Sequence, residues 1–435
     1  MNLELRNLKG TKDYLPAEQQ LRNRIKNTLE AVFARYGCRP LETPVLCHYD
    51  ILASKYAGGE EILKEVYRLQ DQGNRELALR YDLTVPFARV IGMNPNLRLP
   101  FKRYEIGRVF RDGPVKTGRL REFIQCDVDI AGVRSTIAEA ELMAMALDAF
   151  AALNLDVYIS YNNRKLLSGV LASLGIPEEK RNGTILSLDK VEKIGVAGVQ
   201  EELQNEGISP ATIDSIFSVF QKGNTTAYYE RRFDHPLVRA GILELNELEG
   251  YLNALKLADK VRFNPLLARG LEIYTGTVYE VFLSDGRIKG SIASGGRYDH
   301  IIGAFLESET EYPAVGISFG LDVIFTALSM DDDKAEVAAA DIFLIPLDTA
   351  APCLVIARGL RREGFRVEME MGERRLKRSL DYANKEGIPF VLILGENELA
   401  QGEIKLRRMA SGEEISIPLY DLAATLKNML TPLAT

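Results

Sequence analysis

The chain has 435 residues, of which 46 % are hydrophobic and 26 % are charged, and this balance predicts a globular protein with room for two or three domains. There is no run of about 18 apolar residues and no apolar signal segment at the N-terminus, so we expect a cytoplasmic protein without a membrane span. The net charge of −7 argues against a DNA-coating protein but leaves room for local basic surfaces.

Neither the cysteines nor the histidines indicate a metal centre. The four cysteines have no Cys-x-x-Cys spacing, which argues against a structural zinc site and a disulfide framework. The three histidines lie far apart in the sequence, so no metal cluster can be nominated and metal ligands stay unassigned.

The N-terminal part predicts a helix, an extended segment and a hairpin. Residues 20–36 have the apolar periodicity of an amphipathic helix, which Gly37 ends. Two prolines within residues 39–46 favour extended backbone. Short strands are predicted at residues 65–69 and 76–79, with an Asp-Gln-Gly-Asn turn between them.

An acid and a hydroxyl, Asp82 and Thr84, follow the second of these strands. Asp82 would supply negative charge and Thr84 a directed hydrogen bond, a combination that suits an ammonium group. The alternative is that Asp82 is only the N-cap of the following helix. These residues alone leave both interpretations open.

The segment from Phe101 to Gly132 predicts two antiparallel strands joined by a long loop. Such a loop is longer than the connection needs, and the basic side chains in and beside it indicate an anionic ligand. The alternative is a solvated hairpin with surface arginines. The basic residues are Arg111, Lys116, Arg119 and Arg121.

The predicted secondary structure changes twice in the middle of the chain, from mixed helix and strand to helices alone and then back to strands. A periodic helix at residues 135–153 and a strand at 157–161 precede residues 163–260, which are helical, charge-rich and broken by Gly and Pro. We interpret this stretch as an inserted helical module. Strand patterns then resume at residues 268–282, and residues 313–324 predict a strand followed by a helix.

Two features of the resumed strands are candidates for ligand contact. Arg269, in Ala-Arg-Gly-Leu-Glu-Ile-Tyr, is always protonated and can neutralise charge that develops on a reacting phosphate. The alternative is an edge-strand arginine beside a glycine turn. The glycine pair Gly295-Gly296 would let the backbone approach a ligand closely, with Tyr298 as a wall of the pocket.

The C-terminal part predicts a separate small domain. Residues 331–340, rich in Asp, Glu, Lys and Ala, are expected to be a linker. Residues 341–435 alternate strand and helix, which predicts an α/β domain with a mostly parallel sheet. Basic clusters at 374–378 and 405–408 offer charge for phosphates, although each could equally be a solvated surface.

These segments, in this order, resemble the motifs of the class II aminoacyl-tRNA synthetases in their histidyl-tRNA synthetase form. The helix and proline-containing strand resemble motif 1, Arg111 to Asp129 motif 2, and residues 313–324 motif 3. The Arg269 segment resembles the signature particular to histidyl-tRNA synthetases, and the C-terminal part resembles their anticodon-binding domain. The resemblance covers essentially the whole chain.

The resemblance implies an α+β fold. It predicts a class II catalytic domain with an antiparallel sheet over residues 1–330, interrupted by a helical insertion at 163–260, and an α/β anticodon-binding domain over 341–435. It also implies that ATP and L-histidine form histidyl-adenylate and that histidine passes to the 3′ end of tRNA(His). Mg²⁺ is expected to bridge the ATP phosphates, and motif 1 is expected to form the interface of a homodimer. Neither DNA nor a membrane is expected to be a partner.

Motif by motif, the resemblance assigns roles to individual residues. Arg111 and Arg119 would hold the ATP phosphates, and Arg269 would stabilise the attacking carboxylate and the α-phosphate. Imidazole has two nitrogens that each need a polar partner. The residues implied for histidine are Asp82, Thr84 and Gln125 at the amino group, Asp129 and Tyr274 at the imidazole, and Tyr298 beside the pocket.

The chain departs from the family pattern at two positions. Ile273 and the residue before it replace a common Asp-Tyr pair, which removes one aromatic wall of the expected pocket. Val323 stands where the family commonly has an arginine that packs on the nucleotide. We expect Arg121 or Lys116 to take over the contact with the terminal phosphate.

These departures support a rival hypothesis, a non-catalytic regulatory paralogue like the synthetase-like subunit of ATP phosphoribosyltransferase. Such paralogues typically lack the C-terminal domain and the catalytic arginines. Because this chain retains Arg111, Arg119, Arg269 and the C-terminal domain, the sequence favours the synthetase.

Overall fold

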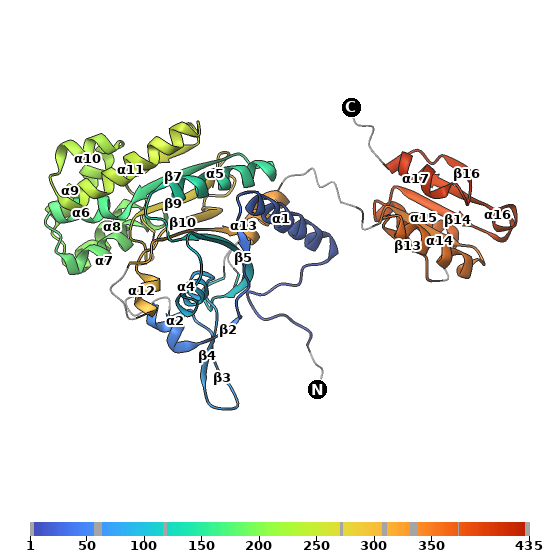
Figure 1. Ribbon diagram of the computed structural model, residues 1–435, viewed down its shortest axis with the longest axis horizontal. Helices are drawn as coiled ribbons and strands as arrows, with labels where there is room; N and C mark the ends of the chain where they lie inside the picture. The colour runs from blue at the N-terminus through green and yellow to red at the C-terminus, as the bar shows by residue number, and fades with distance from the viewer. Residues whose placement is uncertain are drawn as a thin grey trace. The chain divides into compact units, whose positions relative to one another are not determined.

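The computed structural model describes residues 4–55, 63–115, 120–269, 273–306, 311–330, 338, 340–372 and 374–430. The chain divides into two compact units, Met1–Asp332 and Asp333–Thr435 (Figure 1). Within the described ranges, no helix is long and apolar enough to cross a membrane.

An eight-stranded sheet forms the centre of the N-terminal unit, in the order β1-β5-β6-β11-β10-β9-β7-β8. Neighbouring strands from β5 to β7 are antiparallel, and the short edge strands β1 and β8 are parallel to their neighbours. This confirms the predicted antiparallel sheet and the pairing of the two long strands β5 and β6. The strands are β1 Arg39–Pro40, β5 Phe101–Phe110, β6 Glu122–Ala131, β7 Val157–Asn163, β8 Val261–Phe263, β9 Thr277–Leu283, β10 Ala293–Arg297 and β11 Ala314–Gly320.

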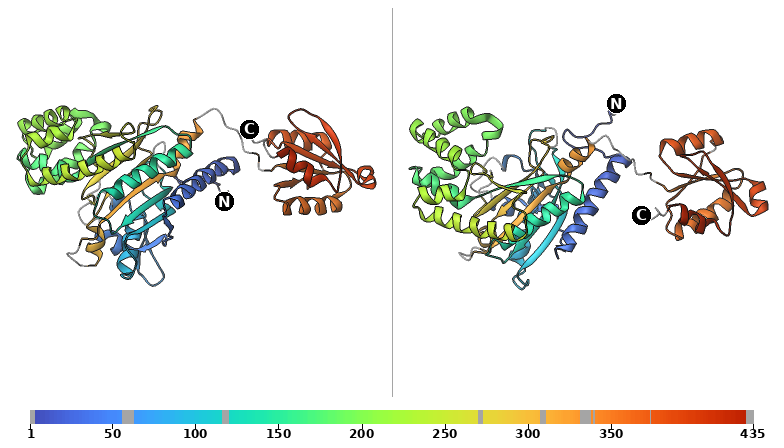
Figure 2. Two further views of the ribbon diagram at one scale, coloured as in Figure 1. Left: turned by 45° about the horizontal axis from the view of Figure 1, so that its top comes forward. Right: turned by 90° about the horizontal axis from the view of Figure 1, so that it is seen from above.

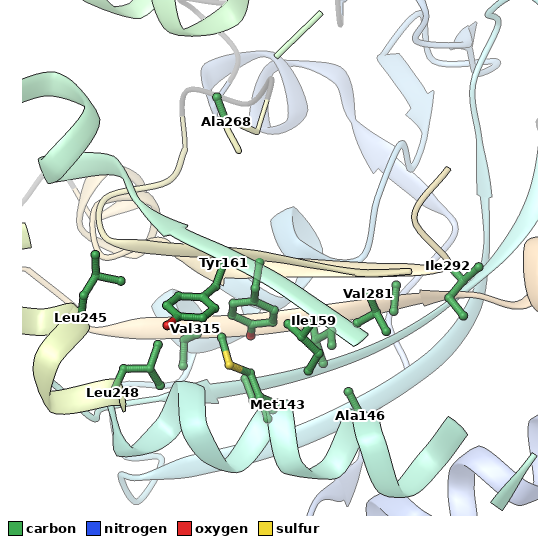
Figure 3. Packing of buried hydrophobic residues seen from close by; sticks show 14 of the residues in the cluster. Met143, Ala146, Ile159, Tyr161, Leu245, Leu248, Ala268, Val281, Ile292 and Val315 are labelled. Atoms are coloured by element: carbon green, nitrogen blue, oxygen red, sulfur yellow. The ribbon is translucent and has the colours of Figure 1, made fainter. Parts of the chain in front are cut away.

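One face of this sheet is covered by the helices that form the main hydrophobic core. Side chains alternate between the two faces of a strand, so Cys126, Val128 and Ile130 of β6 all enter the main hydrophobic core. Figure 3 shows Met143 and Ala146 of α5 beneath core residues of the strands. The opposite face is therefore left to the alternate residues of each strand. The helices with residues in this core include α1 Pro16–Arg35, α5 Ile137–Ala152, α11 Pro236–Ala254 and α13 Leu321–Ser329.

The described residues between β7 and β8 fold as helices, as their sequence predicts. Figures 1 and 2 show α6 to α10 gathered at one end of the sheet. Two glycines allow α6 and α11 to pack closely, because a Cβ at Gly169 would lie 2.6 Å from the Val238 nitrogen and one at Gly241 2.6 Å from the Leu166 nitrogen. The further helices are α6 Arg164–Ser173, α7 Glu178–Leu188, α8 Val191–Asn205, α9 Pro210–Lys222 and α10 Thr226–Arg232.

A three-stranded sheet lies in the same unit, in the order β2-β4-β3. The predicted hairpin is present, although its first strand begins at Arg68 rather than at residue 65. Its turn uses Asn74 at φ 57° and is held by Asp71, which accepts hydrogen bonds from the Gly73 and Arg75 nitrogens. The elements are β2 Leu46–His48, α2 Tyr49–Lys55, β3 Arg68–Gln70, β4 Glu76–Leu79, α4 Thr84–Met93 and α12 Ile301–Phe305.

The C-terminal unit contains a five-stranded sheet in the order β13-β12-β14-β15-β16. The prediction of a mostly parallel sheet is wrong for its second half, because β14, β15 and β16 pair antiparallel. A tight turn with Gly412 at φ 72° joins β15 to β16, too short for the crossover that parallel pairing requires. The elements are β12 Ile342–Pro346, α14 Ala350–Arg362, β13 Val367–Met369, α15 Leu376–Lys385, β14 Phe390–Leu394, α16 Glu396–Gln401, β15 Glu403–Arg408, β16 Glu414–Pro418 and α17 Leu422–Leu430.

Candidate active site

The sheet face opposite the main hydrophobic core carries a block of polar side chains, and α4 and α12 pack against the end of this face that holds Phe101, Ala131 and Ala314. On β6, Gln125, Asp127 and Asp129 alternate with the core residues and so share this face. Residues that pair across neighbouring strands have their side chains on the same face. The block therefore continues from β6 onto β5 and β11, in three rows of paired residues. The rows are Gly107, Gln125 and Gly320; Glu105, Asp127 and Ser318; and Arg103, Asp129 and Gly316, from β5, β6 and β11 in turn.

Asp129, which the sequence predicts beside the imidazole, is held at both carboxylate oxygens. Its Oδ2 lies 2.7 Å from an Arg103 guanidinium nitrogen, and its Oδ1 accepts a hydrogen bond from the Tyr298 hydroxyl. Arg103 is fully buried and also donates to the Leu83 carbonyl at 2.9 Å. Burial raises the pKa of Asp129, and Arg103 opposes that rise. Each carboxylate oxygen keeps a lone pair with which to accept from a ligand.

A second buried ion pair supports this block. Arg80 lies 2.8 Å from Glu105 and donates to the Thr43 carbonyl at 2.7 Å. Glu105 also accepts from the Thr43 nitrogen and hydroxyl, and it lies 3.6 Å from Arg103. The sequence analysis did not identify Arg80, Arg103 or Glu105. The signal that could have identified Arg103 and Glu105 was their spacing of two residues in a strand, which places both side chains on one face. They pair with Asp129 and Asp127 on β6, so the four charged side chains share that face.

Asp82 and Thr84 lie where β4 leads into α4. The N-cap of α4 is Leu83 and not Asp82, although the Asp82 Oδ1 accepts from the Val85 nitrogen in the first turn at 3.0 Å. Thr84 is the first residue of α4. The carbonyl of Leu83, the residue after Asp82, accepts from Arg103 at 2.9 Å, so Asp82 lies beside the polar block. Burial raises the pKa of Asp127 and of Asp129, and the negative charge of Asp82 adds to both rises.

Gln125 lies at the next row of the block. Its side-chain nitrogen donates to the Ser318 hydroxyl at 2.9 Å, so the amide oxygen is oriented away from that contact. This oxygen is buried and has no hydrogen-bond partner among the described residues. A buried acceptor without a partner is costly, and a ligand N–H would satisfy it.

Arg269 and Tyr274 lie against the same face. The Arg269 guanidinium carbon is 5.5 Å from the Tyr274 ring centre, and one guanidinium nitrogen is 3.6 Å from Glu280 on β9. That nitrogen has no hydrogen-bond partner among the described residues. Asn162 of β7 donates to the Leu267 carbonyl at 2.9 Å and so holds the segment that precedes Arg269.

The glycine pair is required by packing within the protein. A Cβ at Gly295 would lie 2.1 Å from the Gly316 oxygen, and one at Gly296 would lie 2.7 Å from the Tyr274 ring. β11 and Tyr274 therefore require glycine at these two positions, and the close backbone approach to a ligand stays a prediction. Tyr298 is buried, with its hydroxyl on Asp129.

The motif 2 arginines have different surroundings. Arg111 is not a freely solvated side chain: its guanidinium carbon lies 4.2 Å from the Tyr81 ring centre and 5.0 Å from that of Phe123. Arg121 lies 3.1 Å from Asp112. The predicted contacts of Arg119 and Lys116 fall outside the described residues.

Val323 and Ile273 both pack with apolar neighbours. Val323, in the first turn of α13, lies against the main hydrophobic core. Ile273 packs against the smaller apolar cluster that contains Phe87 and Tyr298. Asp322, the residue before Val323 in α13, forms an ion pair with Arg22 and accepts a hydrogen bond from Tyr14.

The sequence matches two family models. The first is described as Histidyl-tRNA synthetase and covers residues 10–324; the second is described as Anticodon binding domain and covers residues 341–429. A relative from Bacillus cereus called Histidine–tRNA ligase 1 is 58 % identical over 97 % of this chain and 99 % of its own length.

Solved structures show the same fold. The histidyl-tRNA synthetase of Nostoc sp. PCC 7120 is 31 % identical and superposes with a TM-score of 0.81 over 99 % of this chain and 100 % of that one. A protein from Bacillus halodurans described as an ATP phosphoribosyltransferase regulatory subunit/histidyl-tRNA synthetase has a TM-score of 0.75 at 19 % identity, over 91 % of this chain and 99 % of its own. At that identity the likeness concerns the fold alone.

Proposed function

This chain belongs to the histidyl-tRNA synthetase family, and on that premise we propose that the polar face of its eight-stranded sheet is where L-histidine is activated. The chain is a histidine–tRNA ligase: it uses ATP, histidine and tRNA, and its C-terminal unit is an anticodon-binding domain. The observation that carries this function is the sequence identity of 58 % with a histidine–tRNA ligase over 97 % of this chain.

Histidine binding rests on the polar block. We propose that Asp82, Thr84 and Gln125 bind the α-ammonium group, for which the unpartnered Gln125 oxygen is one acceptor. Asp129 would accept from a ring N–H, and Tyr274 would lie at the other side of the imidazole. Tyr298 acts on the ligand through Asp129, because its hydroxyl donates to that carboxylate and fixes it.

Phosphate binding rests on the arginines. We propose that Arg111 and Arg119 hold the ATP phosphates, and that Arg269 faces the histidine carboxylate and the α-phosphate as charge develops there. The guanidinium nitrogen of Arg269 that lacks a hydrogen-bond partner supports this role. Val323 packs against the hydrophobic core and offers no charge, so Arg121 is one candidate for the terminal phosphate, and it would have to leave Asp112 to reach it.

Magnesium would depend largely on the nucleotide. Among the described residues, no group of three or more His, Cys, Asp or Glu side chains is arranged to hold a metal ion. Mg²⁺ commonly combines one or two carboxylates with phosphate oxygens and water. We therefore propose that phosphates supply most of its ligands, and we derive no step through the ion.

Three further elements of the proposal concern partners, domains and location. We propose that the domain boundaries are those predicted from the sequence, with catalytic residues 1–330 and an anticodon-binding domain over 341–435 for tRNA(His). The α1–β1 segment would form the homodimer interface. We place the enzyme in the cytoplasm, where its tRNA substrate is, with no DNA or membrane partner.

The decisive experiment is histidine-dependent exchange of pyrophosphate into ATP, followed by charging of total tRNA. We expect exchange with histidine and not with other amino acids, and charging of tRNA(His) alone. The regulatory paralogue is not favoured by the comparisons, but its fold is similar. Absence of exchange at millimolar ATP and saturating histidine would overturn the synthetase and revive the regulatory hypothesis.

A further inference from the structure

One carboxyl group in the middle of the polar block has no role in the proposed function. Asp127 lies on β6 between Gln125 and Asp129, with which it shares the sheet face. Residues four apart on a strand are separated by about 13 Å along the backbone. Asp127 lies midway between them, so a histidine that the Gln125 and Asp129 side chains hold from its two ends lies over Asp127.

Asp127 has a buried carboxyl oxygen that is available to bind a ligand. Its side chain is buried, and its Oδ1 has no hydrogen-bond partner among the described residues. Burial raises the pKa of Asp127 to about 7; Arg103 and Ser318 oppose the rise, and Asp129 and Asp82 add to it. A buried carboxyl group in this state carries a proton for much of the time at neutral pH.

The surrounding charges leave the block with too few cations. Arg103 and Arg80 are the guanidinium groups that pair with its carboxyl groups, whereas Arg269, on the same face, pairs with Glu280. Against these two cations stand four carboxyl groups, so full ionisation would leave an excess of negative charge that burial makes unfavourable. The carboxyl groups are Asp82, Glu105, Asp127 and Asp129. The negative charge of Asp127 also adds to the rise that burial causes in the pKa of the Tyr274 and Tyr298 phenols.

We propose that Asp127 is a specificity residue of the histidine pocket, which passes its proton to a ring nitrogen so that histidine is bound as the imidazolium. The inference rests on the proposed function and adds to it a residue and the protonation state of the ligand. The O–H bond of the Asp127 carboxyl group breaks and an N–H bond forms on the ring, with no other reactant. Asp127 then shares with Tyr274 the second ring nitrogen, opposite the one that donates to Asp129.

The proton transfer suits the chemistry of both groups. Free imidazole has a pKa of about 6.5, close to that of Asp127 in the pocket, so neither group holds the proton strongly against the other. The resulting pair is a charge-assisted hydrogen bond, which is roughly twice as strong as a neutral one. An amino acid whose side chain lacks a basic nitrogen would leave the Asp127 carboxyl group unpaired.

The bound complex contains one proton shared between Asp127 and the ring, and this sets its dependence on pH. Above about pH 7.5 both free groups have lost that proton, so kcat/KM for histidine should fall about tenfold per pH unit. Below about pH 6.5 both carry it and one proton must leave, so kcat/KM falls there as well. In Asp127→Asn only the ionisation of histidine remains, and kcat/KM should rise to a plateau that extends to pH 8.5.

The experiment measures pyrophosphate exchange with the full-length chain between pH 5.5 and 8.5, at saturating ATP. It compares the wild type, Asp127→Asn, and Asp156→Asn as a matched control, because Asp156 is a surface residue paired with Lys260. A fall above pH 7.5 in the wild type and the control, and its absence in Asp127→Asn, supports the proposal. A wild-type plateau to pH 8.5 overturns it.

A second measurement uses the wild type and needs no folded variant. The substrate is a histidine analogue with a 1,2,4-triazole ring, which has the shape of imidazole but is far less basic. The wild type should use it at least about tenfold less well than histidine at pH 7, since the charge-assisted bond is lost. Equal use would overturn the inference while leaving the proposed function intact, whereas no exchange with histidine at any pH would defeat the proposed function itself.

Discussion

Replacement of Gly316 by alanine should selectively damage histidine binding. Gly316 pairs with Asp129 across β11 and β6, and a Cβ added there would lie 2.0 Å from the Asp129 Oδ1 and 2.8 Å from its carboxyl carbon. The carboxylate must therefore move. Movement breaks its 2.7 Å contact with Arg103 or its hydrogen bond from Tyr298.

The size of the effect follows from the contact that is lost. A hydrogen bond to a charged group contributes about 1.5–3 kcal/mol, and each 1.4 kcal/mol changes an equilibrium constant about tenfold. Gly316→Ala should therefore raise KM for histidine by about 10- to 100-fold. KM for ATP should change by less than about threefold, because Gly316 pairs with Asp129, at the imidazole end of the proposed site. The free energy of unfolding should fall by about 1–3 kcal/mol.

The assay is pyrophosphate exchange with histidine and ATP varied in turn, together with denaturant unfolding followed by circular dichroism. Gly250→Ala is the matched control, since Gly250 lies within α11 and its Cβ would meet nothing within 4 Å. The control should keep both KM values and gain up to about 1 kcal/mol of stability. A folded Gly316→Ala enzyme with an unchanged KM for histidine would refute the assignment of Asp129 to the imidazole.

Three further predictions concern the arginines, the nucleotide and the C-terminal domain. Arg269→Ala should slow pyrophosphate exchange by about a hundredfold or more while circular dichroism stays unchanged, and near wild-type exchange would remove Arg269 from the mechanism. The wild type should exchange pyrophosphate at millimolar ATP, because Arg121 or Lys116 replaces the contact that Val323 does not make; a KM for ATP about one to two decades above that of Val323→Arg would show that the contact is missing. A chain ending near Met330 should keep exchange and lose most tRNA charging, and full charging would assign another role to the C-terminal unit.

Several features of the fold were predictable because their signals are local. Alternation of apolar and polar residues with a period of two predicts β5 and β6, and Gly and Pro mark the turns between elements. The helix at α1 and the β3–β4 hairpin follow from the same kind of pattern. The order of the motifs then indicated the family and the positions of Gln125, Asp129 and Arg269, since each lies in a contiguous segment.

Strand direction in the C-terminal sheet was less predictable. A βαβ pattern predicts parallel neighbours, and β12, β13 and β14 obey it. The pattern ends after α16, where a short turn with Gly412 converts the last two strands into a hairpin. The sequence analysis missed β16, and it did not predict that β15 runs antiparallel to β14.

The sequence by itself determined which residues alternate onto the polar face of each strand, because that property depends only on neighbours along the chain. It could not determine which faces meet. Tyr298 and Asp129 are 169 residues apart and come into contact because β10, β11 and β6 are adjacent in the sheet. That order buries Arg103 among three carboxyl groups and leaves Asp127 without a partner at one oxygen, since burial and charge balance are properties of the assembled sheet.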